Sequence, residues 1–136
     1  MKPIDVAKAV GLALAVLVLL IATAAIYIWS WVVEPGHPKA YYVSIAPRIA
    51  GHSTRVFGTA LCLAAMWLLA RRRPERNPYL FALCFFAAYL LLDFGMVGFR
   101  DVYNLEVGLS VLVKLAGTLL GAWLGARAAR PSPAAA

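Results

Sequence analysis

Residues 105–126 form a predominantly apolar segment that carries a lysine near its middle. As an α-helix rising about 1.5 Å per residue, this segment reaches about 33 Å, which is enough to cross the hydrocarbon core of a bilayer. An unpaired charge at that depth costs at least about 2.5–3.5 kcal/mol, so Lys114 requires a polar partner or water. The segment therefore predicts a membrane helix whose lysine is paired inside the protein.

The composition of the chain is that of a membrane protein rather than a soluble domain. Hydrophobic residues make up 63% of the sequence and charged residues only 14%, whereas a soluble domain has about 25% charged residues. The net charge of +7 comes from basic residues gathered at the ends of apolar segments, where membrane proteins carry them to fix orientation. Because no nucleic-acid-binding motif accompanies this charge, it predicts the lipid bilayer as a partner and not a nucleic acid.

Three further apolar segments precede residues 105–126, which predicts an all-α, polytopic membrane protein with four transmembrane helices in an antiparallel bundle. The expected spans are about 6–32, 54–72, 78–99 and 105–126, within a single domain of residues 1–130. Residues 131–136 are expected to be a disordered tail. The first span is expected to be retained rather than cleaved as a signal peptide, because its apolar run continues well past the cleavage-like Ala22-Thr23-Ala24.

The long connection between the first two spans contains apolar residues as well as polar ones. Residues 34–38 hold two prolines and a glycine, and these are expected to end the first helix. We expect a short interfacial helix within 39–50, broken near Pro47, because tyrosine and aliphatic side chains lie favourably at the headgroup level. Ser53 or Thr54 is then the expected N-cap of the second span.

The distribution of basic residues predicts the orientation of the chain in the membrane. Four arginines lie within 71–76, which places the connection between the second and third spans in the cytoplasm. With four spans, both termini are then cytoplasmic, in a bacterial-type inner (plasma) membrane. Lys39, Arg48 and Arg55 fall on the outer side and do not follow the rule. Aromatic residues near both expected boundaries support the same orientation: Trp67, Tyr79 and Trp123 inside, and Tyr41, Tyr42 and Tyr103 outside.

Asp93 and Lys114 are the expected intramembrane polar site. Asp93 lies about 9 Å below the outer end of the third span, and Lys114 about 13 Å below that of the fourth, so the two side chains can pair between adjacent helices. Arg55 and Arg100 are expected to compete for the carboxylate. Three interpretations stay open: an ion pair that fixes helix register, a polar site on an ion, proton or solute route, and charges that contact a partner protein or a lipid headgroup.

Gly117, Gly121 and Gly125 form two overlapping GxxxG spacings on the fourth span. Such a stripe of small residues lets another helix backbone approach closely. We expect it to pack against the chain's own helices, with a homo-oligomer or a protein partner on the fourth helix as the alternatives.

The sequence contains no motif that indicates catalysis, a metal site or a cofactor. Cys62 and Cys84 lie inside apolar segments and form no CxxC pair, so neither redox nor zinc chemistry is indicated. His37 and His52 flank the first connection, but their spacing fits no metal-binding motif. Because no nucleophile stands beside a base, we expect no catalytic residue, no metal site and no cofactor.

These features favour a small non-catalytic membrane protein that acts as an accessory, assembly or partner-binding subunit. The alternative is a minimal ion, proton or small-solute transporter formed by oligomerisation, with Asp93, Lys114 and Arg55 lining the path. A third interpretation, an enzyme acting on lipid at the outer surface, would use the two histidines of the first connection with Arg48 and Arg55.

Overall fold

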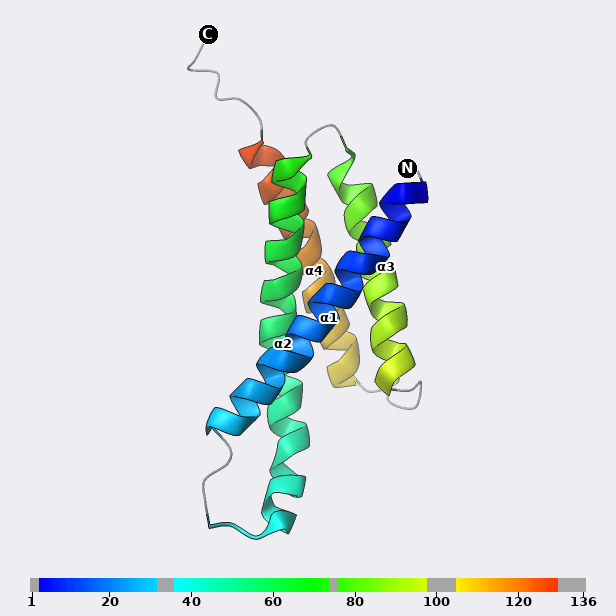
Figure 1. Cartoon of the computed structure of the whole chain (residues 1–136). Coiled ribbons are helices and arrows are strands. Elements are labelled where there is room, and N and C mark those ends of the chain that lie inside the picture. The colour runs from blue at the N-terminus through cyan, green and yellow to red at the C-terminus, as the bar shows by residue number, and fades with distance from the viewer. Residues whose placement is uncertain (1–2, 32–35, 74–75, 98–104, 130–136) are drawn as a thin grey trace.

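The chain folds into four long helices (Figure 1). The computed structural model describes residues 3–31, 36–73, 76–97 and 105–129, without the side chains of residues 31, 46–50, 96 and 97. The helices are α1 (Pro3–Trp31), α2 (Lys39–Arg72), α3 (Pro78–Val97) and α4 (Leu105–Ala128). Each contains a segment long and apolar enough to cross a membrane. The prediction of an all-helical chain with four such helices is confirmed.

Local chemistry accounts for several of the helix ends. Pro3 occupies the first position of α1, where its missing N–H is not needed, and Asp5 in the first turn favours the positive end of the helix dipole. At the start of α3, the Asn77 side-chain oxygen accepts hydrogen bonds from the backbone N–H groups of Tyr79 and Leu80, at 3.1 and 3.2 Å. Asn77 therefore caps α3 in the way that asparagine commonly caps helices.

Helix α2 is longer than the sequence predicted, and the expected separate interfacial helix is wrong. Residues 39–50 are helical, but they continue without a break through residue 47 into the second span. Ser53 is buried, and the Thr54 hydroxyl donates to the Gly51 carbonyl one turn before it, so neither residue caps a helix. An internal proline removes one hydrogen bond and costs about 3 kcal/mol, but that local cost does not interrupt α2.

The first part of α2 extends beyond the other helices, and we call residues 39–53 the α2 arm. Arg55 reaches the backbone carbonyl of Glu106 in the first turn of α4, with its Nη2 at 3.4 Å. About 24 Å of α2 therefore precedes the level at which α4 begins. Figure 1 shows this projection below the ends of α3 and α4. At about 51 Å, α2 exceeds a hydrocarbon core of about 30 Å by far.

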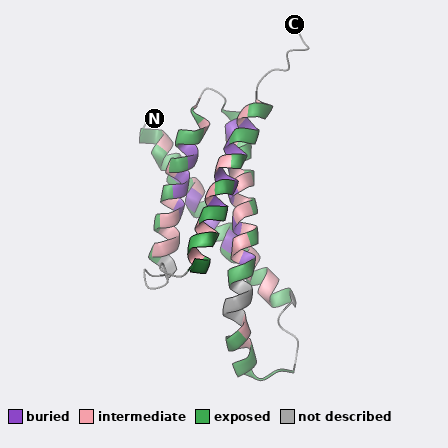
Figure 2. Cartoon of the chain, turned by 180° about the vertical axis from the view of Figure 1, so that it is seen from behind, coloured by how far each residue is buried: buried purple, intermediate pink, exposed green. Residues whose placement is uncertain are grey.

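The helices enclose a core of apolar side chains contributed mainly by α1, α2 and α3. Helix α2 packs most extensively on α4, while α1 crosses both α2 and α3. The largest fully buried side chains include Leu20 of α1, Met66 of α2, and Phe85 and Tyr89 of α3. Figure 2 shows exposed residues along the outer faces of the helices, and many of them are leucines. Such faces are suited to contact with lipid.

Three of the four glycines of α4, Gly117, Gly121 and Gly125, lie directly on the α2 backbone. A Cβ atom added to Gly121 would overlap the Leu63 carbonyl oxygen, and one added to Gly125 would overlap that of Trp67. At Gly117 the same atom would lie 2.7 Å from the Thr59 methyl carbon. We call this contact the α2–α4 seam: Thr59, Leu63 and Trp67 against Gly117, Gly121 and Gly125. Only glycine permits so close an approach.

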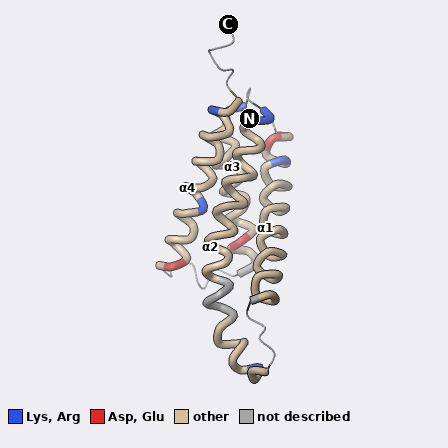
Figure 3. The backbone as a smooth tube through the Cα atoms, turned by 90° about the vertical axis from the view of Figure 1, so that its left-hand side faces the viewer, with Lys and Arg blue, Asp and Glu red and all other residues tan. Residues whose placement is uncertain are grey.

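An ion pair lies at the end of the molecule opposite the α2 arm. The Arg76 guanidinium pairs with the Asp5 carboxylate, which ties the start of α1 to the connection between α2 and α3. Consecutive helices run in alternating directions, so the end of α4 lies at this same end (Figure 1). Several Lys and Arg residues lie in the chain at this end (Figure 3), and we call it the basic end. The expected Arg100 contact and the expected tail of residues 131–136 lie outside the described residues.

Replacing Gly121 by Ala is expected to lower the stability of the fold by about 1–3 kcal/mol, because the added methyl group must push α2 and α4 apart. Gly108→Ala is the matched control on the same helix, since nothing lies within 4 Å of a Cβ at that position. The control should be neutral or up to about 1 kcal/mol more stable. Thermal unfolding in detergent, followed by circular dichroism, measures both. Equal melting temperatures for the two variants would contradict the seam.

Candidate functional site

Lys114 is the centre of the polar site within the helices. Its ammonium donates a hydrogen bond to the Tyr89 hydroxyl at 3.0 Å and lies 3.6 Å from a carboxylate oxygen of Asp93. The same ammonium lies 5.2 Å from the centre of the Tyr89 ring. Tyr89 and Asp93 are one turn apart on α3 and so present both groups on one face. The structure thus brings together the two charges that the sequence singled out.

A glycine on a third helix makes room for the lysine. A Cβ atom added to Gly58 of α2 would lie 2.8 Å from Lys114 Cε and 3.6 Å from its Nζ. Neither Gly58 nor Tyr89 was predicted from the sequence to be part of the site. Tyr89 could have been found from its place four residues before Asp93, on the same helix face. Gly58 carried no signal, because nothing in the sequence shows which part of α2 faces Lys114.

The two charges differ in their access to the exterior of the chain. The Lys114 side chain is 6% exposed, whereas that of Asp93 is 26% exposed. The ammonium is therefore enclosed by protein, while the carboxylate reaches the outer surface of α3. In a membrane this surface meets lipid or another protein, so the free edge of Asp93 is the one part of the site open to an external group.

Arg55 does not join this site. Within the described part of the chain it forms no ion pair with Asp93; instead, it donates to the Glu106 carbonyl. Its Nε atom is buried, and no hydrogen-bond partner for it is present among the described atoms. The predicted competition of Arg55 for Asp93 is therefore not seen. Arg55 of α2 lies beside Glu106 in the first turn of α4, and Glu106 is about two helical turns from Lys114.

A short row of polar groups continues from Lys114 toward the basic end. The hydroxyl of Thr118, which is fully buried, donates to the Lys114 backbone carbonyl at 2.7 Å. Cys62 of α2 is also fully buried. A threonine that donates to the preceding turn is satisfied within its own helix.

The two histidines of the first connection do not converge. His37 stacks on Tyr41, with ring centres 4.4 Å apart, and His52 is exposed on α2. The helical residues between them separate the two side chains by about 20 Å. Across the residues that the structure describes, no three His, Cys, Asp or Glu side chains come together as a metal site. The side chain of Arg48 lies outside the described residues.

The site can hold one proton or stabilise one charge, but its groups mainly satisfy one another. One acid, one base and one phenol meet across α3 and α4, with α2 closing the lysine side. Such an arrangement penalises helix packings that would leave either charge alone. Comparisons with known protein families, with curated proteins and with solved structures found no match.

Replacing Lys114 by Met is expected to lower the stability of the fold by about 1–3 kcal/mol, because Asp93 then lacks its counter-charge; partial exposure of Asp93 keeps the loss below that of a fully buried pair. The double variant Lys114→Met/Asp93→Asn should recover part of this loss, since no charge is left unpaired. Thermal unfolding in detergent provides the comparison. A single variant as stable as the double variant would contradict a stabilising ion pair.

Proposed function

We propose that the chain is a small non-catalytic integral membrane protein, acting as an accessory, assembly or partner-binding subunit in a bacterial-type inner membrane. The observation that carries this proposal is the enclosure of Lys114. Its ammonium contacts Tyr89 and Asp93 within one chain, and its side chain is almost fully buried. A transport path would instead expose such a group to water or to a symmetry-related copy.

The basic end is proposed to face the cytoplasm, with the four helices spanning the bilayer as an antiparallel bundle. Arg71 lies over the Trp67 ring at 5.6 Å, and Arg127 lies over the Trp123 ring at 5.4 Å. Both tryptophans are partly exposed near the ends of α2 and α4. Amphipathic rings beside arginines are typical of a membrane interface, and an excess of arginines is typical of its cytoplasmic side.

The α2 arm is the surface that we propose for a protein partner. Tyr41 is 43% exposed and Val43 is 66% exposed, although no other described helix covers this part of α2. Lys39, Ala40 and Ser44 are also exposed, whereas Tyr42 and Ile45 are half-buried, so most of the helix surface at residues 39–44 is uncovered. Aromatic and aliphatic side chains on an uncovered helix fit a groove in a partner protein.

The direction of the arm favours a protein partner over the membrane surface. A helix that lies in the headgroup region must turn away from the transmembrane direction. The arm continues from the α2 span in the same general direction (Figures 1 and 3). It therefore leaves the bilayer on the side opposite the basic end and carries Tyr41 and Val43 into water unless a partner covers them.

The transporter alternative rests on the exposed edge of Asp93. With 26% of its side chain accessible, Asp93 could face a path enclosed by several copies of the chain, with Lys114 behind it. In that case the purified protein should conduct ions or protons in liposomes. Loss of this conduction in Asp93→Asn would support the alternative and count against a non-catalytic subunit.

The double variant Tyr41→Ala/Val43→Ala is expected to lose about tenfold or more of the protein partner retained by the wild type, because it removes the exposed anchor residues of the arm. Ser44→Ala is the matched control, since its hydroxyl bonds only the Tyr41 carbonyl of its own helix. Purification from native membranes in mild detergent, with quantitative mass spectrometry, measures retention. Absence of any stoichiometric partner, or equal retention by the two variants, would overturn the arm as a docking surface.

A further inference from the structure

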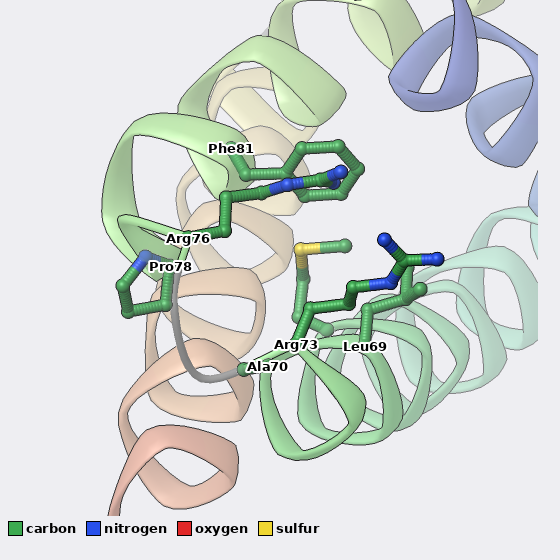
Figure 4. A pocket seen from close by; sticks show the side chains of 7 residues that line it. Leu69, Ala70, Arg73, Arg76, Pro78 and Phe81 are labelled. Atoms are coloured by element: carbon green, nitrogen blue, oxygen red, sulfur yellow. The ribbon is translucent and has the colours of Figure 1, made fainter. Parts of the chain in front are cut away.

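A small pocket opens at the basic end, between the end of α2 and the start of α3 (Figure 4). Its volume is about 10 Å³, and its lining includes Met66, Leu69, Arg73, Arg76 and Phe81. Two guanidinium groups thus border an apolar recess. We propose that this pocket, here called the arginine pocket, binds the phosphate group of an anionic phospholipid. The proposal requires membrane insertion but is independent of any protein partner on the α2 arm.

One wall of the arginine pocket is held in place before any ligand arrives. The Arg76 guanidinium lies 4.5 Å from the centre of the Phe81 ring and pairs with Asp5, and its side chain is 18% exposed. Contacts on an aromatic face and with a carboxylate fix the plane of this group. A fixed guanidinium loses little conformational entropy when it donates a further hydrogen bond to a phosphate oxygen.

The second wall supplies a positive charge that no described carboxylate neutralises. Arg73 is exposed, and in the described part of the chain its guanidinium forms no ion pair. Figure 4 shows that the side chains of Arg73 and Arg76 extend in the same direction on either side of the pocket. Asp5 balances Arg76, so Arg73 provides the charge that attracts a monoanion. Asn77 already occupies the first amides of α3, and the anion is therefore held by the guanidinium groups rather than by a helix end.

The surroundings favour a phospholipid over a soluble phosphate. The pocket volume admits about one water-sized group, so a single phosphate oxygen enters while the rest of the headgroup lies across the mouth. Phe81, Met66 and Leu69 form the apolar side. Tyr79 and Leu80 of α3 are exposed next to it, and they can contact the first part of an acyl chain. Basic pockets between membrane helices on the cytoplasmic side are suited to anionic headgroups.

The test is lipid titration of the delipidated full chain in detergent, read by native mass spectrometry. Phosphatidylglycerol and phosphatidylcholine with the same acyl chains are the two probes. The wild type should bind phosphatidylglycerol about tenfold more tightly than phosphatidylcholine, and Arg73→Gln should remove most of this preference. Arg71→Gln is the matched control, because it makes the same charge change at a side chain that lies over Trp67, away from the pocket. It should change the affinity by less than about twofold.

Three outcomes would overturn the proposal. Equal losses in Arg73→Gln and Arg71→Gln would show a diffuse electrostatic effect without a defined site. No headgroup preference in the wild type would exclude anion recognition altogether. Competition by millimolar inorganic phosphate with the same sensitivity to Arg73→Gln would identify a soluble anion as the ligand instead. Should Arg73→Gln lower the melting temperature, Arg73→Lys provides the second variant: it keeps the charge but loses the bidentate geometry, and an intermediate affinity is expected.

Discussion

The close approach of α2 and α4 is the contact on which the polar site depends. Gly117, Gly121 and Gly125 bring α4 onto the α2 backbone, and Lys114 lies one turn before the first of these glycines. The seam therefore decides how deep Lys114 is buried and places Gly58 beside its side chain. Once the ammonium is enclosed, α3 must present a compensating group at the same level. Tyr89 and Asp93 provide it, so the position of α3 follows from the seam through the lysine.

The site and the fold were predictable from the sequence to different extents. Four apolar segments were enough to locate four helices, because lipid demands length and apolarity in continuous runs. Asp93 and Lys114 could be related through their depths along helices joined by a short turn. Tyr89 could have been found from its spacing to Asp93 on one helix face. Gly58 could not be identified, since rotation of α2 about its axis is set by packing and not by composition. The continuity of α2 through Pro47 was not predicted, because the usual effect of an internal proline is to end or kink a helix. The sequence does not show the packing that keeps α2 continuous.

The charged residues of the chain have two different roles. Lys114 and Asp93 are paired across α3 and α4, and Asp5 and Arg76 are paired at the basic end. These pairs fix relative helix positions, as a buried or half-buried charge pair does by penalising other arrangements. Arg73 differs because its guanidinium has no ionic partner in the described chain and lies beside a pocket. A cation that forms no ion pair in the described chain and also borders a pocket is the one that we propose for an external anion.

The two ends of the molecule expose different side chains: arginines and tryptophans at one end, and tyrosine and valine at the other. This difference favours a subunit with a fixed orientation. The basic end combines arginines with tryptophan rings at the ends of α2 and α4, and such a surface would be attracted to the anionic leaflet that we propose it faces. The α2 arm at the other end exposes Val43 and one part of Tyr41, whose ring is stacked on His37. Because α2 runs continuously from the arm to the arginines, anchoring its end at one leaflet fixes the height of the arm above the other. A rigid helix of this kind would hold the proposed partner at a constant distance from the membrane without any movement of the chain.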